Sequence, residues 1–359
     1  MPDGLLDSIR NAVLTGAARL VFAMPDGLLT AIFGHPPAVA ADLRPDAWAL
    51  CRIAGLVEKD AGSVGPLEMR IDTENLARVV ALSPEHGVDA RDIDLESEAG
   101  ILKSRLYVPP GSATTDPLMI YFHGGGWVVG SLDTHDRSCR RLANSAGIRI
   151  LAVDYRLAPE HPFPAAVDDA LAAWQAVQAD PSRFGADPGR IAVGGDSAGG
   201  NLAAVLCQDL RGLGEAQPVF QLLIYPVVHI GARTGSKSDF AQGFYLTTER
   251  MDWYDAQYCQ GNAGQDVRAS PLLTEDFSGL APAYIVSALA DPLRDEAEDY
   301  ARRLADAGVP VRLDRMPLVH AWFNITISRS SKKAHDVIAE QIRTYLAEVP
   351  DPATSSSTD

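Results

Sequence analysis

The chain has 359 residues, a length that suits one large α/β domain with an accessory element better than two unrelated domains. Its 47 Asp and Glu outnumber its 31 Lys and Arg, and the formal net charge of −16 argues against a surface for nucleic acid or an anionic membrane. The four cysteines are widely separated and form no CxxC pair, so the sequence predicts neither a disulfide framework nor a zinc site.

The first 90 residues predict a mostly helical segment. Apolar residues recur at helical spacing over residues 5–33 and 73–82, and a Pro-rich linker around His35 separates these stretches. No basic region precedes the first apolar residues, and no run approaches the roughly 18 apolar residues of a membrane span. We therefore expect a cytoplasmic protein without stable membrane insertion.

Beyond residue 90, strand patterns alternate with helix patterns. Runs rich in Val, Ile and Leu predict strands at 92–96, 102–108, 118–123, 149–154, 190–194, 219–224, 283–288 and 311–316. Helical patterns predict helices at 134–145, 165–179, 198–210, 295–307 and 332–347. This alternation predicts an α/β fold with a mostly parallel central sheet of about eight strands and helices on both faces.

Two stretches depart from this alternation. Residues 225–268 are rich in Gly and aromatic residues and form a long insertion between a strand and the next βα unit. An insertion beside strand ends that carry catalysis usually forms a lid or part of a pocket. Residues 349–359 contain three consecutive serines and predict a disordered tail. The α/β domain is therefore expected in two parts, 91–224 and 269–348.

A serine lies at a predicted turn between a strand and a helix. The segment Gly195-Asp196-Ser197-Ala198-Gly199 fits the pattern G-x-S-x-G in that context. A tight turn of this kind lifts the serine hydroxyl to the tip of a sheet. We therefore predict that Ser197 is a nucleophile, whereas Asp196 positions the backbone near the turn.

Chain order selects the partners of this serine, because an acid and then a histidine should follow it. Only His320 and His335 lie beyond Ser197 with a full strand–helix unit in between. His335 falls at an ordinary surface position of a helix, whereas His320 follows the last strand in a loop, so we predict His320 as the base. Asp291 directly follows the preceding strand and can hold the histidine Nδ1–H, although a helix-preceding cap is the alternative interpretation.

The run His123-Gly124-Gly125-Gly126 follows a strand and predicts donors for an oxyanion. We expect the Gly124, Gly125 and Ala198 amides to form the oxyanion hole, and His123 to brace the loop by hydrogen bonds. A phosphate-binding loop is disfavoured, because the run lacks both the G-K-[ST] ending and the G-x-G-x-x-G spacing.

Four motifs occur in order along the chain, namely HGGG at 123–126, YRLAPE at 155–160, GDSAG at 195–199 and DPLRDE at 291–296. Together they resemble the hormone-sensitive lipase family of α/β-hydrolase esterases, and the resemblance covers roughly residues 102–346. With Asp196 in its serine motif, the chain resembles the GDSAG branch, the bacterial family IV esterases. One departure is His320-Ala321-Trp322, where the family often has His-Gly-Phe.

The resemblance implies an α/β-hydrolase fold and a serine carboxylesterase acting on short- to medium-chain esters through an acyl-enzyme. It implies a mainly helical cap built from residues 1–90 and 225–268. A small-molecule ester is the expected partner, and no cofactor or metal is expected. Family members often pair, so a homodimer is a further expectation.

Aromatic residues near these motifs are candidates for the substrate pocket. Trp127 lies beside the glycine run, and Phe244 and Tyr245 lie in the insertion. A plain cap core explains the aromatic residues of the insertion about as well, namely Phe240, Phe244, Tyr245, Trp253 and Tyr254.

Two alternative functions stay open at this point. An amidase or deacetylase of the same fold would use the same residues, because ester and amide hydrolysis share this machinery. A non-catalytic small-molecule binding protein would keep the serine but lack the histidine, and the presence of His320 argues against it.

Overall fold

The structure is a computed structural model that describes residues 14–57, 63–81, 85, 87–97, 100–261 and 263–348. The predicted disordered tail at 349–359 lies outside the described residues, as does the start of the helical segment at 1–13.

Eight strands form one sheet, in the order β1-β2-β4-β3-β5-β6-β7-β8. β2 pairs antiparallel with β1 and β4, and all pairs from β4–β3 to β7–β8 are parallel. The predicted mostly parallel sheet is confirmed, and each of the eight predicted strands overlaps an observed one. The strands are β1 Asp89–Ser97, β2 Gly100–Val108, β3 Asp116–Phe122, β4 Arg149–Val153, β5 Ala186–Asp196, β6 Gln221–Ile224, β7 Ala283–Ala290 and β8 Val311–Val319.

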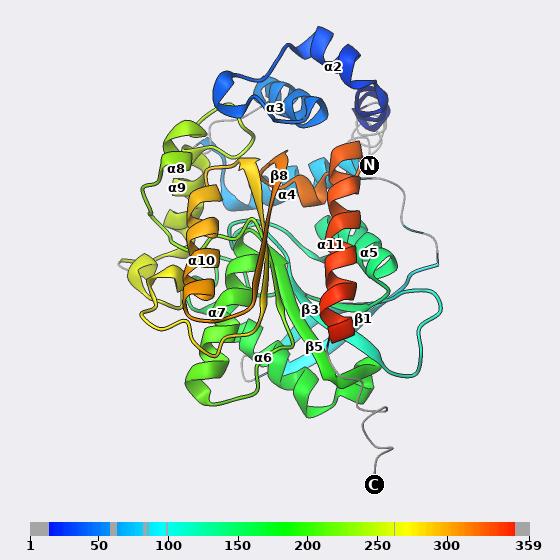
Figure 1. Cartoon of the computed structure of the whole chain (residues 1–359), viewed down its shortest axis with the longest axis vertical. Coiled ribbons are helices and arrows are strands. Elements are labelled where there is room, and N and C mark those ends of the chain that lie inside the picture. Colours follow the sequence, from blue (N-terminus) through cyan, green and yellow to red (C-terminus); the bar gives the residue numbers. More distant parts are fainter. Residues whose placement is uncertain are drawn as a thin grey trace.

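Helices cover both faces of this sheet (Figure 1). α5 contacts β2, β4 and α11 on one face, whereas α7 contacts β3, β5, β6 and α6 on the other, where α10 covers β7 and β8. The bounds of these helices are α5 Leu132–Ala146, α6 Ala165–Ala179, α7 Ala198–Leu213, α10 Arg294–Asp306 and α11 Arg329–Glu348.

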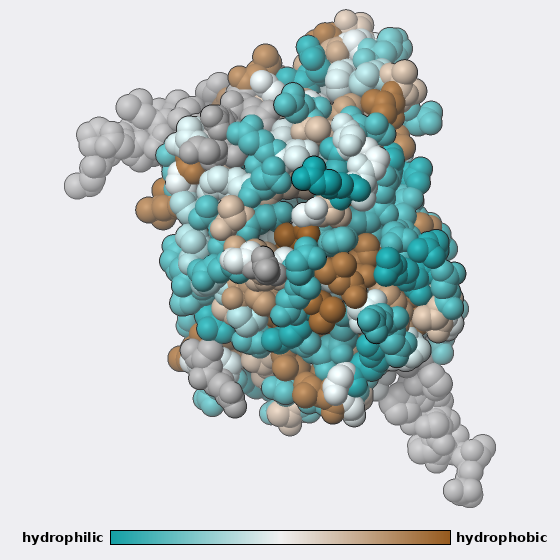
Figure 2. All heavy atoms as spheres, turned by 90° about the vertical axis from the view of Figure 1, so that its left-hand side faces the viewer, coloured by the Kyte–Doolittle hydropathy of each residue, from teal (hydrophilic) through white to brown (hydrophobic). Residues whose placement is uncertain are grey.

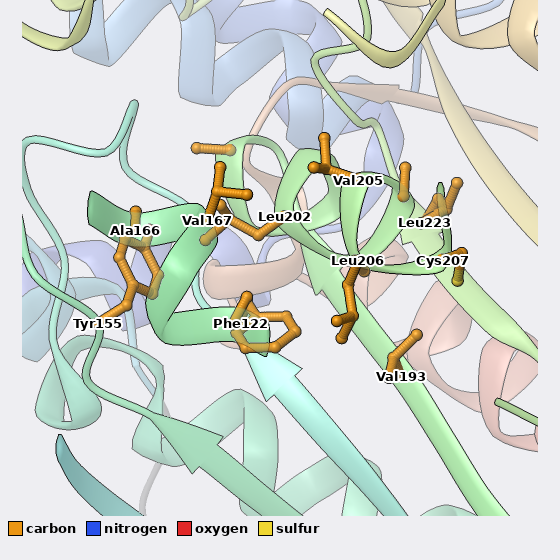
Figure 3. Packing of buried hydrophobic residues seen from close by; sticks show 14 of the residues in the cluster. Phe122, Tyr155, Ala166, Val167, Val193, Leu202, Val205, Leu206, Cys207 and Leu223 are labelled. Atoms are coloured by element: carbon orange, nitrogen blue, oxygen red, sulfur yellow. The ribbon is translucent and has the colours of Figure 1, made fainter. Parts of the chain in front are cut away.

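The central strands are buried from both sides because most of their side chains are apolar, whereas the outer strands β1 and β8 are largely exposed. Every residue of β4 and β6 is buried. Figure 3 shows part of the core beneath α6 and α7, where Phe122 of β3 and Val193 of β5 pack with Leu202 and Leu206 of α7. This packing holds the end of β5 firmly in the middle of the sheet.

A mainly helical cap lies over the carboxyl ends of the parallel strands, with α2 and α3 at the upper end of the molecule (Figure 1). Its two parts touch each other. The Trp48 and Phe244 rings lie 6.0 Å apart, and Arg250 Nη1 lies 3.5 Å from Met69 Sδ. The cap helices are Leu14–Ala23, α2 Asp26–Phe33, α3 Pro45–Val57 and α4 Pro66–Val80, with α8 Gly235–Asp239 and α9 Thr248–Tyr258 from the insertion.

Figure 2 shows hydrophilic residues over most of the described part of one face, with apolar residues between them. Across the described ranges, no single helix is long and apolar enough to cross a membrane. Leu14–Ala23 and Asp26–Phe33 meet that test only as a pair, bent by 115°.

Candidate active site

Ser197 stands at the sharp turn between β5 and α7, as its motif predicts. Its backbone has φ 55° and ψ −117°, a conformation that costs free energy and persists only where the surroundings enforce it. The Ser197 amide donates to the Ile224 carbonyl at 2.8 Å. A Cβ atom at Gly199 would collide with the Phe122 carbonyl, so glycine lets the helix approach β3 this closely.

A continuous chain of hydrogen bonds joins the three predicted catalytic side chains. His320 Nε2 lies 2.9 Å from Ser197 Oγ, and His320 Nδ1 lies 2.7 Å from Asp291 Oδ2. Asp291 follows β7 and His320 follows β8, so both side chains sit at the carboxyl ends of neighbouring parallel strands. All three are buried, and Asp291 is fully inaccessible. An ionised carboxylate only accepts, so Nδ1 carries the proton and Nε2 accepts from the serine hydroxyl.

The two oxygens of Asp291 have different partners. Oδ2 faces His320, while Oδ1 accepts from the Leu293 amide at 2.8 Å. Asp291 is not the N-cap of α10, because that residue is Leu293 and has no side-chain cap bond, so the structure does not show the alternative role of Asp291 as a helix cap. The second bond fixes the orientation in which Asp291 meets the imidazole.

His335 is a correction, because it does not occupy a surface position. Its side chain is fully buried, its Nε2 donates to the Phe323 carbonyl at 2.8 Å, and its ring stacks on Phe323 with centroids 4.3 Å apart. Burial lowers the pKa of His335 to about 3, so the ring is neutral. It supports the segment that follows His320.

His123 has the bracing role that the sequence predicts. Its Nδ1 donates to the Gly124 carbonyl at 2.8 Å, and its ring stacks on Tyr155 at 4.3 Å. Burial lowers the pKa of His123 to about 3, which keeps the ring uncharged. The Tyr155 hydroxyl in turn donates to the His123 carbonyl at 2.7 Å, so the start of the glycine loop is held from both sides.

The prediction that Gly124 supplies an oxyanion donor is wrong in this structure. The Gly124 amide donates to Asp196 Oδ1 at 2.9 Å, so it is not free to turn toward a substrate. The Gly125 carbonyl accepts from the Val128 and Val129 amides at 3.1 and 3.0 Å. Because the two ends of a trans peptide group point in opposite directions, the Gly126 N–H points away from that turn.

Three amides near Ser197 remain available as donors. Within the part of the chain that the structure describes, the Gly125, Gly126 and Ala198 N–H groups have no hydrogen-bond acceptor. The Ala198 amide also belongs to the first turn of α7, where the helix dipole favours negative charge. Three adjacent glycines look alike in a sequence, so no sequence signal separates Gly124 from Gly126.

Asp196 ties the glycine loop to the segment after His320. Tyr121 donates to Oδ1 at 2.9 Å, Asn324 donates to Oδ2 at 3.2 Å, and His135 Nε2 lies 3.2 Å from Oδ1. Burial raises the pKa of Asp196, but His135 and the hydrogen-bond donors outweigh burial and hold that pKa below its usual range. The sequence predicts a positioning role for Asp196 but gives no signal for His135 or Asn324.

The predicted pocket residues occupy the border between the loop and the cap. Trp127 is buried and stacks on Tyr258 with centroids 4.2 Å apart. Phe244 is buried beside Trp48, while Tyr245 is half-buried and has a left-handed φ of 75°. Contact of Trp127, Phe244 and Tyr245 with substrate stays a prediction. Tyr254 is the aromatic side chain placed directly against the loop, because a Cβ at Gly126 would meet its ring.

No group of three or more His, Cys, Asp or Glu side chains suited to a metal ion occurs among the described residues. The hydrogen-bonded serine, histidine and aspartate lie beside amides that have no other acceptor among the described residues.

Comparisons with known proteins show what the whole chain is similar to. A family model described as the α/β-hydrolase fold matches residues 119–324. The carboxylic ester hydrolase LipN of Mycobacterium tuberculosis is 45% identical, over 74% of this chain and 73% of that protein. The ethyl acetate hydrolase of Pseudomonas putida is 40% identical, over 85% of this chain and 99% of that protein.

Solved esterase structures also superpose closely. An ester hydrolase from the Lake Arreo metagenome has a TM-score of 0.81 at 37% identity, covering 85% of this chain and 99% of its own. The esterase of Pyrobaculum calidifontis has a TM-score of 0.77 at 37% identity, covering 84% and 98%. The chain therefore belongs to the α/β-hydrolase family, in its hormone-sensitive-lipase-like group of ester hydrolases.

Proposed function

We propose that this protein is a serine carboxylesterase in which Ser197 is the nucleophile, His320 the general base and acid, and Asp291 the residue that orients His320. The observation that carries the proposal is the unbroken chain from Ser197 Oγ to His320 at 2.9 Å and from His320 to Asp291 at 2.7 Å. Carboxylic ester hydrolases at 40–45% identity support the same reaction class.

The mechanism follows from the proton positions. Ser197 Oγ attacks the ester carbonyl while His320 Nε2 takes its proton, and Asp291 stabilises the imidazolium that forms. His320 then gives this proton to the leaving alkoxide, which departs as the alcohol and leaves an acyl-serine. Water, deprotonated by His320, attacks the acyl-serine, and the acid is released as Ser197 regains its proton.

The oxyanion of both tetrahedral intermediates rests on the Gly125, Gly126 and Ala198 amides in this proposal. They lack other acceptors among the described residues, so they are available when charge develops. Loss of one such donor typically costs a factor of about 10²–10³ in kcat. The Gly124 amide has a different task, because it anchors the loop to Asp196.

We further propose that the substrates are short- to medium-chain esters. The Tyr254 ring packs against Gly126 and restricts the space above the loop. One relative, matched over 99% of its own length, is named an ethyl acetate hydrolase. Ethyl acetate is an ester with a two-carbon acyl group. Trp127, Phe244 and Tyr245 are the proposed pocket aromatics.

Hydrolysis of a series of p-nitrophenyl esters from acetate to palmitate, beside a matched anilide, tests the proposal. We expect kcat/KM to be highest for the short esters, to fall for the long ones, and to be much lower for the anilide. Equal or higher kcat/KM for the anilide would favour an amidase. No turnover of any substrate would favour a binding protein.

Location and assembly are part of the same proposal. We expect a cytoplasmic enzyme that forms a homodimer and binds no nucleic acid. Light scattering coupled to size exclusion measures the mass in solution, and a mass of 38.4 kDa, that of one chain, would contradict the dimer.

A further inference from the structure

One side chain of the cap binds the loop that carries the proposed oxyanion donors. Arg70 lies on α4, and its Nε donates to the Val128 carbonyl at 2.8 Å. Its Nη2 donates to the Ala158 carbonyl, also at 2.8 Å. Val128 is two residues beyond Gly126, so the guanidinium bonds directly to the loop.

Two peptide groups connect this cation to the Gly126 amide. The Val128 carbonyl accepts from Arg70, and the N–H of the same peptide group, which belongs to Val129, donates to the Gly125 carbonyl at 3.0 Å. The Gly125 carbonyl and the Gly126 N–H are opposite ends of the next peptide group. The chain of bonds therefore runs from Arg70 through two peptide groups to a proposed oxyanion donor.

Such a chain has two physical effects on the donor. Each bond fixes the plane of the peptide group that it reaches, so the Gly126 N–H is oriented before substrate binds. Hydrogen bonds in a chain also polarise one another, and a partly buried charge at one end strengthens the donor at the other. Only 23% of the Arg70 side chain is exposed, so water screens this effect only partly.

A second route holds the same loop. The Ala158 amide donates to the Trp127 carbonyl at 2.8 Å, while the Ala158 carbonyl accepts from Arg70. Glu160 then fixes the guanidinium through bonds of 2.9 Å to Nη1 and 2.6 Å to Nη2. The hydrogen bond from Arg70 lowers the pKa of Glu160 to about 2, so this carboxylate stays ionised at neutral pH.

The other part of the cap packs on the same stretch of loop. Tyr254 of α9 covers Gly126, and Tyr258, one turn further along α9, stacks on Trp127 with an interplanar angle of 5°. The cap therefore touches three consecutive residues, Gly126, Trp127 and Val128, two through aromatic rings and one through Arg70.

We propose that Arg70 is a positioning residue for ester hydrolysis, through which the cap orients and polarises the Gly126 amide of the oxyanion hole. This inference rests on the proposed function, because it assigns a task to Arg70 only if an oxyanion forms beside Ser197. Arg70 touches neither the substrate nor the reacting atoms in this account.

The test compares Arg70→Met and Arg70→Lys with Arg78→Met. Arg78 lies on the same helix but its side chain is 62% exposed, and it bonds Glu74 and Asn75 of its own helix. Each preparation is titrated with a fluorophosphonate, so that kcat and KM refer to folded active sites. Binding of an aryl trifluoromethyl ketone, which forms a tetrahedral adduct with the serine, is measured in parallel.

We expect Arg70→Met to lower kcat about 10- to 100-fold with KM changed less than about threefold, because the loss falls on the transition state. Affinity for the trifluoromethyl ketone should fall by a similar factor. Arg70→Lys should lie between wild type and Arg70→Met, since an ammonium reaches one carbonyl but does not reproduce the fork. Arg78→Met should match wild type in both measurements.

The outcomes separate the inference from the proposed function. If the wild type neither turns over esters nor reacts with the fluorophosphonate, the proposed function fails. If the wild type is active and titrated Arg70→Met keeps its kcat and ketone affinity within twofold, the inference alone fails. Should Arg70→Met not fold, Arg70→Lys decides, and wild-type values for it overturn the inference.

Discussion

The Asp196 carboxylate accepts the Gly124 amide at 2.9 Å and so ties the residue before the nucleophile to the glycine loop on the neighbouring strand. Asp196 and Ser197 are adjacent, so this bond sets the distance between the attacking oxygen and the proposed oxyanion donors. It also uses the amide that the sequence had assigned to the oxyanion.

Asp196→Asn should weaken this link. A neutral amide oxygen accepts hydrogen bonds less strongly than a carboxylate oxygen. The asparagine NH₂ group is also a donor, so it cannot accept from the donor groups that face Oδ2 in the wild type. We expect kcat/KM to fall about tenfold and the free energy of unfolding to fall by about 1–3 kcal/mol, measured by ester kinetics and urea denaturation. Tyr121→Phe is the matched control, because it removes another donor to Asp196 but keeps the Gly124 bond. If Tyr121→Phe lost as much activity as Asp196→Asn, the bond between Asp196 and Gly124 would not be the cause of the loss.

Asp291→Asn should abolish most activity without unfolding the protein. The asparagine can present its NH₂ group to His320 Nδ1 and favour the wrong tautomer, so we expect kcat to fall about 10³- to 10⁴-fold. Asp295→Asn is the control, since Asp295 bonds the cap residue Ser236 at 2.8 Å instead of the histidine. A kcat for Asp291→Asn within tenfold of wild type would rule out Asp291 as the orienting acid.

Ala321 follows the proposed base in a left-handed conformation, with φ 61° and ψ 12°. A Cβ atom in this region costs roughly 1–2 kcal/mol, and glycine avoids the cost. Ala321→Gly should therefore raise the free energy of unfolding by about 1 kcal/mol, as measured by urea denaturation. An unchanged or lower stability would mean that packing of the Ala321 methyl group outweighs the strain.

His335 makes stability depend on pH. Its pKa is about 3 in the folded protein because of burial, against an ordinary value of 6.5. Between these values the unfolded chain binds a proton that the folded chain does not, so this group's stabilising contribution is complete above pH 6.5 and is lost as pH falls toward 3. The slope from one such group is about 1.4 kcal/mol per pH unit.

His335→Gln keeps a donor for the Phe323 carbonyl but removes the titration. Urea denaturation from pH 4 to 7 should therefore show that the free energy of unfolding depends less steeply on pH in the variant. The difference in slope should correspond to about one bound proton. His161→Gln, the same substitution at an exposed position, is measured alongside. Equal slopes in His335→Gln and wild type would contradict the neutral buried state.

The sheet and the three proposed catalytic residues are predictable because their signals are local. Apolar runs give the strands, and the order of Ser197, Asp291 and His320 along the chain reflects a sheet in which successive strands end at one edge. His320 was separable from His335 because one follows a strand and the other lies within a helix.

The wrong or missing predictions concern residues whose burial and hydrogen bonds are determined by tertiary contacts. Helical spacing placed His335 on the surface, but packing against Phe323 buries it. Gly124 and Gly126 differ in what lies beside them, Asp196 for one and Tyr254 for the other, and only Gly126 of these two has a positive φ, of 58°. Arg70 lies in no motif, and its partners are two backbone carbonyls 58 and 88 residues away and the Glu160 carboxylate 90 residues away in the chain.

Ser197 is the proposed nucleophile, and His320 is proposed to activate it. Both roles are tested together by reaction with a fluorophosphonate, followed by intact mass measurement and peptide mapping. We predict one adduct per chain, located on Ser197, with no adduct on Ser197→Ala and a strongly slowed reaction of His320→Ala. An adduct on another residue, or equal labelling of Ser197→Ala, would contradict the account.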